Sequence, residues 1–425
     1  MKITEVRLTP ILIADAPVLN VGGVHQPYSP RLVVEVETED GTCGVGETYG
    51  DTVYLGLAER IAGEVVGREL TATNLLLSTA ASARTGQHAD ALAELNSMGL
   101  RGSASQDKLR RSVTSAFEVA CLDALGRATG LPVHALLGGK VRDRVDYSAY
   151  LFYKWAEHPG ADDPQDDWGE VLDPAGVVEL ARRFTERYGF RSIKLKGGVL
   201  PPEEEVAAIA ALHEAFPGVP LRLDPNGAWS VDTAVRVAEQ TADVLEYLED
   251  PTLGTPGMAE VRRRTGVTLA TNMCVTAFAE IPEAFATDAV QVVLSDHHYW
   301  GGLAATRELA AVCRTWDVAV SMHSNTHLGI SLAAMTHVAA TVPELQYACD
   351  THRPWQTEDV ITEPHRFVDG ALPVDDRPGL GVELDRDALA RLHERWRASD
   401  VRDRDDVAAM RRAEPGWEPR SFPKW

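Results

Sequence analysis

The chain has 425 residues, of which 44% are hydrophobic and 24% charged, a composition that is ordinary for a globular protein and argues against a disordered one. Its 41 basic and 63 acidic side chains give a formal net charge of −22, which argues against nucleic acid as a partner. An anionic substrate would therefore have to be attracted by local cations.

The cysteines and the N-terminus bear on the compartment. The five cysteines, at positions 43, 121, 274, 313 and 349, are widely spaced and form no CxxC pair, so we expect reduced thiols in the core. The N-terminal segment alternates like a strand, with Glu5 and Arg7 early, and predicts neither a signal peptide nor a transmembrane helix. We therefore expect a cytoplasmic protein with no membrane partner.

The first part of the chain predicts a small α+β domain over residues 1–138. Residues 31–38 alternate like a strand and are followed by a turn at Asp40-Gly41. A helical stretch over 112–129 stops at Gly130-Leu131-Pro132.

After this domain, short apolar runs that read as buried strands recur, with helical patterns between them. The runs cover 145–151, 192–196, 220–224, 244–249, 267–272, 289–294, 318–323 and 345–350, and the helical patterns include 202–216, 232–240 and 303–316. Eight strands that alternate with helices favour a parallel β/α barrel over an open doubly wound sheet, and no glycine-rich phosphate loop follows a strand. We predict a TIM-type (β/α) barrel over 139–384, and a C-terminal segment, 385–425, that packs back on the first domain.

Polar residues stand where these predicted strands end. They are Lys194, Lys196, Asp224, Glu249, Asn272, Asp296 and His323. In a β/α barrel the carboxyl ends of the strands form the mouth that holds the active site. The pattern therefore indicates a single site.

Lys194 and Lys196 are two residues apart, so a strand directs both side chains to one face. Two ammonium groups inside a barrel mouth would lower each other's pKa, which makes a lysine usable as a base near neutral pH. The alternative is an exposed edge strand with solvated lysines, but the flanking Ile193 and Gly197-Gly198 disfavour it.

Asp224, Glu249 and Asn272 end three successive strands and supply a hard-cation set of oxygen ligands, as Mg²⁺ prefers. Any one of them alone could instead cap the helix that follows. Three in succession favour a metal site.

His323 and Asp296 end neighbouring strands, so the carboxylate could fix the tautomer of the imidazole and raise its basicity. We interpret the adjacent His297 and His298 as loop residues.

Over nearly its whole length the chain resembles the enolase superfamily, and within it the glucarate dehydratase group. The matching stretches are IKLKGGVL (193–200), LDPNGAWS (223–230), LEDP (248–251), ATNM (270–273), SDHHYW (295–300), HSNTH (323–327), ISLA (330–333), THVAA (336–340), CDTH (349–352) and PGLGVE (378–383). The resemblance implies a modified (β/α)7β barrel with an N-terminal α+β capping domain. It also implies a homo-oligomer.

The resemblance further implies the roles of the strand-end residues. Mg²⁺ on Asp224, Glu249 and Asn272 would bind the carboxylate of an acid sugar, with Lys194 adding positive charge. Lys196 would abstract the α-proton from one face. His323, held by Asp296, would act on the other face as a base for the α-epimer, or as the acid that expels the β-hydroxyl.

The resemblance implies substrate contacts from several segments. The matching positions are Asn20, His25, Tyr150, Asn226, Ser324, Asn325 and His352, with Arg420 as a weaker match in the C-terminal tail. In the family the capping domain reads the far end of the substrate.

The chain departs from the family around the pocket. After Glu249-Asp250-Pro251 it reads TLGTPGM, a shorter loop without the family's acidic residue, so the third ligand falls to Glu249. After His323 it reads NTHLGIS instead of NNHFDIS. Three functions are therefore open: dehydration of D-glucarate and L-idarate to 5-dehydro-4-deoxy-D-glucarate or of another acid sugar, racemisation or epimerisation on the same scaffold, and a non-catalytic binding barrel.

Overall fold

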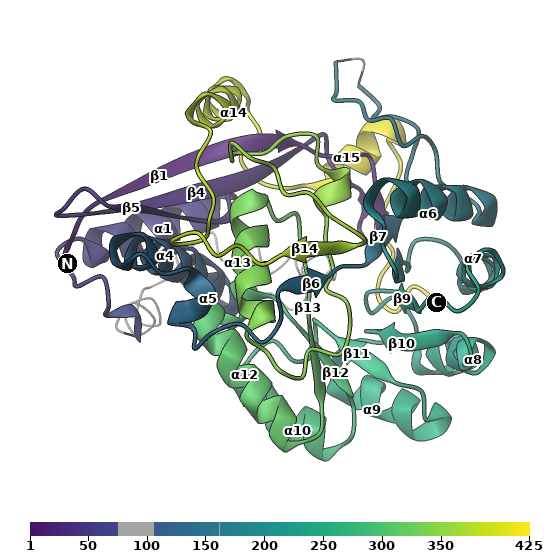
Figure 1. Ribbon diagram of the computed structural model, residues 1–425. Helices are drawn as coiled ribbons and strands as arrows, with labels where there is room; N and C mark the ends of the chain where they lie inside the picture. The colour runs from purple at the N-terminus through teal and green to yellow at the C-terminus, as the bar shows by residue number, and fades with distance from the viewer. Residues whose placement is uncertain (75–105, 161) are drawn as a thin grey trace.

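The computed structural model describes residues 1–74, 106–160 and 162–425 (Figure 1). At the N-terminus, β1 (Ile3–Ala14), β4 (Tyr28–Thr38) and β5 (Cys43–Tyr49) form an antiparallel sheet in the order β1-β4-β5. Two short strands, β2 (Leu19–Asn20) and β3 (Gly23–Val24), pair beside it. Helices α1 (Thr52–Val65) and α4 (Gln106–Thr129) complete this capping domain. The α+β prediction is confirmed.

The second domain is built on a curled parallel sheet. In the described residues seven strands follow one another in chain order: β7 (Ala149–Phe152), β8 (Ile193–Lys196), β9 (Leu221–Asp224), β10 (Leu245–Glu249), β11 (Leu269–Thr271), β12 (Val292–Ser295) and β13 (Ala319–Met322). All neighbouring pairs are parallel. The predicted (β/α) barrel is confirmed.

The two outermost strand predictions need correction. Residues 145–151 do not form one strand, because β6 (Arg144–Asp146) turns away to pair antiparallel with β14 (Ala371–Pro373) before β7 begins. Residues 345–350 form isolated bridges, Leu345 to Val320 of β13 and Cys349 to Tyr147. These bridges close the barrel between its first and last strands.

Helices cover the outside of the barrel. They are α6 (Pro174–Tyr188), α7 (Pro202–Ala215), α8 (Val231–Thr241), α9 (Gly254–Thr265), α10 (Ile281–Ala286), α12 (Leu303–Thr315) and α13 (Gly329–Ala340). Their limits follow from local chemistry. The Asp173 side chain accepts a hydrogen bond from the Gly176 N–H at the start of α6, and Gly189 ends it in the left-handed conformation.

Two carboxylates of the capping domain reach the barrel helices. Glu118 of α4 accepts hydrogen bonds from the N–H groups of Leu303 (2.5 Å) and Ala304 (3.1 Å), where α12 begins. Glu47 of β5 accepts from Leu328 (2.8 Å) and Ser331 (3.0 Å), where α13 begins. A carboxylate at a helix N-terminus satisfies free N–H groups and interacts favourably with the helix dipole.

The C-terminal segment contains α14 (Arg386–Ala398) and α15 (Asp406–Ala413). It contacts the capping domain, for example through His393, whose Nδ1 donates to the Pro10 carbonyl (2.7 Å). Its last residues contact the barrel, because the Lys424 N–H donates to the Ala228 carbonyl (2.7 Å). The domain limits at 138 and 384 stay predictions.

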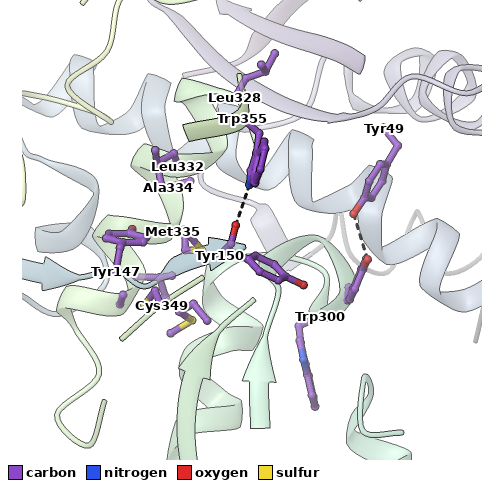
Figure 2. Close-up of a cluster of buried hydrophobic side chains, with 14 of the residues drawn as sticks. Tyr49, Tyr147, Tyr150, Trp300, Leu328, Leu332, Ala334, Met335, Cys349 and Trp355 are labelled. Atoms are coloured by element: carbon purple, nitrogen blue, oxygen red, sulfur yellow. Dashed lines mark hydrogen bonds between the residues drawn. The ribbon is translucent and has the colours of Figure 1, made fainter. Parts of the chain in front are cut away.

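Apolar and aromatic side chains of both domains pack in one buried cluster, part of which is drawn in Figure 2. In it the Trp355 indole N–H donates to the Tyr150 carbonyl at the end of β7 (2.8 Å; Figure 2). None of the helices in the described part of the chain combines the length and apolar character needed to span a bilayer.

Candidate active site

A cavity opens at the carboxyl ends of the barrel strands; together with the solvent at its mouth it encloses about 530 Å³ of space free of protein atoms. Its lining comes from both domains and the C-terminal segment. The residues are Asn20, Val21, His25, Tyr150, Phe152, Lys196, Asn226, Asn272, Tyr299, His323, Ser324, Asn325, His352 and Arg404. The lining includes every predicted substrate contact except Lys194 and Arg420. Lys194 lies fully buried below the cavity.

The two lysines of β8 have different partners. Lys194 Nζ lies 2.6 Å from Glu249 Oε2, 2.7 Å from Asp350 Oδ2 and 3.3 Å from Asp224 Oδ2. Lys196 Nζ donates to Asp224 Oδ2 (2.8 Å) and to Asn226 Oδ1 (2.7 Å), at the cavity wall. Lys194 is therefore an internal counter-charge, and Lys196 is the lysine whose Nζ lies at the cavity wall.

The pKa of Lys194 corrects the sequence expectation. Burial by itself would lower this pKa, but the carboxylates of Asp350 and Glu249 outweigh burial and hold the pKa well above its usual range. The prediction of a lysine pKa lowered by its neighbour is therefore wrong for Lys194.

Asp224 and Glu249 lie side by side below the cavity. Burial would raise the pKa of Asp224, but Lys196 and Lys194 outweigh burial and lower it. Burial and then the neighbouring Asp224 raise the pKa of Glu249 well above its usual range. Two adjacent buried carboxylates create a demand for positive charge at this point.

The oxygen atoms present fit a hard cation. Among the described residues, Glu249 Oε1 and Asn272 Oδ1 are buried and accept no hydrogen bond. Uncoordinated buried oxygens of this kind are the donor set that Mg²⁺ prefers. The next residue along, Asp250, is already engaged, because it accepts from Thr271 Oγ1 (2.5 Å) and the Asn272 N–H (2.8 Å). This arrangement leaves Glu249 as the available ligand.

The turn after β9 presents Asn226. This residue has φ of +55°, a conformation that asparagine tolerates better than most residues, and its N–H donates to Asp224 Oδ1 (3.1 Å). Gly227 follows with φ of +75°. The Pro-Asn-Gly turn therefore aims the Asn226 amide at Lys196.

His323 follows β13, and its Nδ1 lies 3.1 Å from Asp296 Oδ2. Because a carboxylate only accepts, Nδ1 carries the proton and Nε2 is left as the basic atom. Burial lowers the pKa of His323, and the hydrogen bond to Asp296 opposes that shift. The structure thus brings the predicted histidine and aspartate together.

The sequence suggested that His297 and His298 are loop residues, and this prediction is wrong. They lie buried in the short helix α11 (His297–Trp300). His298 Nδ1 is 3.0 Å from Asp296 Oδ1, and its Nε2 is 3.0 Å from the Glu47 carbonyl oxygen. His298 therefore holds Asp296 in place from the side opposite His323.

Contacts from the capping domain, the C-terminal segment and the last barrel loop enclose the far end of the cavity. Asn20 Nδ2 donates to Asp406 Oδ2 (2.9 Å), and His25 Nδ1 lies 3.2 Å from Asp15 Oδ2. His352 Nδ1 lies 3.2 Å from Ser324 Oγ. The structure does not bring Arg420 here, because its guanidinium lies over the Trp425 ring, 5.5 Å from the centroid.

Five residues of the site were missed from the sequence, among them Val21, which lines the cavity. Arg404 lines the cavity and pairs with Asp406 (2.8 Å), and Tyr299 lies beside His323 with ring centroids 5.6 Å apart. Phe152 also lines the cavity, and Asp350 pairs with Lys194 below it. Asp350 ends the last predicted strand and Tyr299 stands in the SDHHYW stretch, so both carried a positional signal.

A parallel β/α barrel that gathers lysines, acids and a histidine at its strand ends, under an α+β cap, defines the enolase-type architecture. The chain belongs to this superfamily. Residues 4–138 match the family "Mandelate racemase / muconate lactonizing enzyme, N-terminal domain", and residues 176–388 match "Enolase C-terminal domain-like".

Proteins similar in sequence to this chain support its assignment to the superfamily. A "Probable glucarate dehydratase" of Streptomyces coelicolor is 66% identical over 428 residues, which cover 100% of this chain and 99% of that protein. A D-galactarolactone cycloisomerase of Agrobacterium fabrum is 27% identical and covers 92% of this chain and 98% of its own. The chain is therefore similar to an enzyme, of a family that includes lyases and isomerases.

Solved structures show the same fold. An enolase from Thermobispora bispora complexed with magnesium and formate has a TM-score of 0.92 and 51% identity, with 100% of both chains covered. An enolase from Pseudomonas fluorescens with bound magnesium, potassium and tartrate has a TM-score of 0.94 and 48% identity, and covers 100% of this chain and 99% of its own.

Proposed function

We propose that the protein is a Mg²⁺-dependent hydro-lyase that dehydrates an acid sugar, with D-glucarate and L-idarate as the first candidates and 5-dehydro-4-deoxy-D-glucarate as their product. The observation that carries the proposal is the cavity itself, where Lys196 and the Asp296-held His323 face one enclosed space above uncoordinated oxygens. The relative named as a probable glucarate dehydratase supports the choice of substrate.

Asp224, Glu249 and Asn272 would hold the metal. When bound, Mg²⁺ supplies Lewis-acid stabilisation of the negative charge that develops on the substrate carboxylate. The Lys194 ammonium lies beneath the same point, 2.6 Å from Glu249, and adds positive charge without facing the cavity. Fixed charges in a closed, dry site act strongly on a developing dianion.

The proton transfers are assigned to two side chains. Lys196 Nζ, as the free amine, takes the proton α to the carboxylate, and the electron pair moves onto the carboxylate as an enediolate. When the enediolate collapses, the β-hydroxyl leaves as water with a proton from Nε2 of His323, which acts in this step as the imidazolium, with a proton on each ring nitrogen and Nδ1 held by Asp296. The enol that remains tautomerises to the 2-keto acid.

The far end of a diacid needs a second set of donors. Arg404, which is paired with Asp406, lies at the wall formed by the C-terminal segment, and Asn20, His25 and His352 supply polar groups beside it.

The test is incubation of the purified protein with Mg²⁺ and a panel of sugar mono- and diacids, with semicarbazide detection of 2-keto acids. We expect turnover of glucarate or idarate. Epimerisation of an acid sugar without a 2-keto product would replace the lyase by a racemase or epimerase. No reaction with any acid sugar would favour a binding protein.

Metal removal gives a second test. We expect EDTA to abolish turnover and Mg²⁺ to restore it, because the buried carboxylates need a cation. The Glu249→Gln variant should bind Mg²⁺ at least tenfold more weakly, as measured by metal-dependent thermal stabilisation. Turnover that survives chelation would refute the metal assignment. The cytoplasmic location, which rests on the cysteine pattern and the N-terminal segment, and the homo-oligomeric state, which rests on the family resemblance, belong to this proposal.

A further inference from the structure

A second hollow lies at the other end of the barrel. It has a volume of about 410 Å³ and is lined where the strands begin, by Arg191 and Ser192 before β8, Pro220 before β9, Glu246 in β10 and residues 345–348. Since the sheet is parallel, this end is opposite the candidate active site. Beside it, β6 pairs with β14 (Figure 1), and β6 contributes Arg144 and Asp146 to the lining.

Three arginines of this hollow keep their full charge. Arg142 donates to the carbonyls of Val342 (2.9 Å) and Pro343 (3.0 Å), and Arg144 donates to the carbonyl of Val368 (2.9 Å). Arg191 is exposed, and within the described ranges none of the three arginines pairs with a carboxylate. Neutral carbonyls position a guanidinium without cancelling its charge.

A buried hydroxyl points to the same ligand chemistry. Ser192 is only 5% exposed, and its Oγ has no hydrogen-bond partner among the described residues. A buried donor of this kind is costly unless something accepts from it. Ser192 stands beside Arg191 in the lining, so one bound oxygen could serve both.

The acidic residues of the lining offset part of the positive charge of these arginines. Arg222 is fully buried and pairs with Glu246, so these two charges cancel. Asp146 and Asp369 remain, against the three guanidiniums. The local balance is therefore positive, in a chain whose overall charge is −22.

We propose that this hollow is a binding site for a small, multiply charged oxyanion, a phosphate ester or a polycarboxylate. Guanidinium groups match the planar oxygen pairs of both chemistries, and the free Ser192 hydroxyl adds a further donor. The size of the hollow suits a compact metabolite. The proposal does not depend on the reaction assigned to the other end of the barrel.

The test is calorimetric titration of the full chain, without Mg²⁺, with pyrophosphate as one probe and citrate as the other. The probe that binds more tightly shows whether the site prefers a phosphate ester or a polycarboxylate. We expect saturable binding that the double variant Arg144→Gln/Arg191→Gln weakens by about tenfold or more, in line with the loss of two charge-assisted hydrogen bonds. The control Arg263→Gln, on exposed α9, should leave the affinity unchanged. Lys196→Ala, in the other cavity, should also leave it unchanged.

A variant that is expected to bind the anion more tightly separates a direct effect on the site from a loss of binding caused by misfolding. Asp369 has φ of +49°, which asparagine accepts, so Asp369→Asn removes one opposing charge and leaves the backbone as it is. We expect Asp369→Asn to bind the anion severalfold more tightly. The proposal is overturned if neither probe binds saturably, if the double variant binds like the parent, or if Asp369→Asn weakens binding.

Discussion

At the scale of single residues, Lys194 and Lys196 show how two side chains of the same type take different roles because their surroundings differ. Both leave the same face of β8. Lys194 is enclosed by Glu249, Asp350 and Asp224, so it is held as an ammonium, whereas Lys196 reaches the cavity beside Asn226. Only a group at the cavity wall can exchange a proton with a substrate.

We predict that Lys196→Ala loses α-proton exchange with one substrate epimer by a factor of about 10² to 10⁴, the usual contribution of a general base. Exchange of the other epimer, catalysed by His323, should persist. Proton NMR in D₂O measures both rates, and His323→Asn is the matched variant with the reverse pattern. Equal losses for both epimers in both variants would refute the assignment of two faces.

Lys108 of α4 gives a prediction about pH. It is 4% exposed, its Nζ lies 3.5 Å from the centroid of the Tyr299 ring, and burial lowers its pKa to about 7 although Asp296 opposes the shift. Because this pKa is below the ordinary value of 10.5, the folded protein binds fewer protons than the unfolded chain between pH 7 and 10.5. The cost of burying the ammonium is therefore largest below pH 7 and declines as pH rises.

We expect Lys108→Met to raise the free energy of unfolding by on the order of 2 kcal/mol at pH 6, since the ring recovers part of the burial cost. The gain should shrink toward pH 10. Urea unfolding at both pH values measures it. A difference between variant and parent that does not change with pH would contradict the account.

At the scale of elements, the loops after β8 and β9 are packed too closely for a side chain between them. Gly198 has φ of +71°, and a Cβ there would lie 2.2 Å from the Pro225 carbonyl oxygen. Pro225 precedes Asn226, which contacts Lys196. The spacing of these loops therefore sets the geometry of the site.

We predict that Gly198→Ala lowers the free energy of unfolding by about 2–3 kcal/mol, from backbone strain and the clash together, and reduces kcat/KM. Gly67→Ala is the control. Gly67 has φ of +86° with nothing within 4 Å of its Cβ position, so only the conformational cost of about 1 kcal/mol applies. Equal effects of the two substitutions on stability would contradict the role of the clash.

The sequence predicted most of the barrel because its signals are local. Apolar runs such as that of β9, and helix limits such as those of α7, α8 and α12, depend on neighbours in the chain. The segment 345–350 could not be judged in this way. It is apolar enough for a strand, but its two backbone edges meet β13 and Tyr147, which are remote in sequence.

The difference between local and remote contacts also explains which residues of the candidate active site could be predicted from the sequence. The residues predicted at strand ends lie together at one end of the barrel, since a parallel barrel gathers the carboxyl ends of its strands; their roles stay predictions. Arg404 and the position of Arg420 were not predictable, because both lie on a tail whose path is set by remote contacts such as Thr52 to Asp403 (2.8 Å) and Ser230 to Trp425 (2.5 Å).

At the scale of the whole molecule, Glu47 joins the two domains. It is fully buried, lies 2.5 Å from Arg31 Nη2 and accepts from the start of α13. We predict that Glu47→Gln lowers the free energy of unfolding by about 3–5 kcal/mol, because it leaves the buried Arg31 charge without its partner. Chemical unfolding measures the change. Glu260→Gln, which breaks an exposed pair with Arg263, should cost about 1 kcal/mol or less, and a comparable loss in both variants would argue against the special position of Glu47.

The two carboxylates that cap α12 and α13 have a consequence for folding. Each helix obtains the partners of its first N–H groups from a strand or helix nearly two hundred residues or more away, Glu118 to Leu303 and Glu47 to Leu328. The barrel without its cap would have two unsatisfied helix ends, and the cap without the barrel would expose two buried acids. The domains are therefore not interchangeable modules, and heating the intact chain should give one calorimetric transition instead of two.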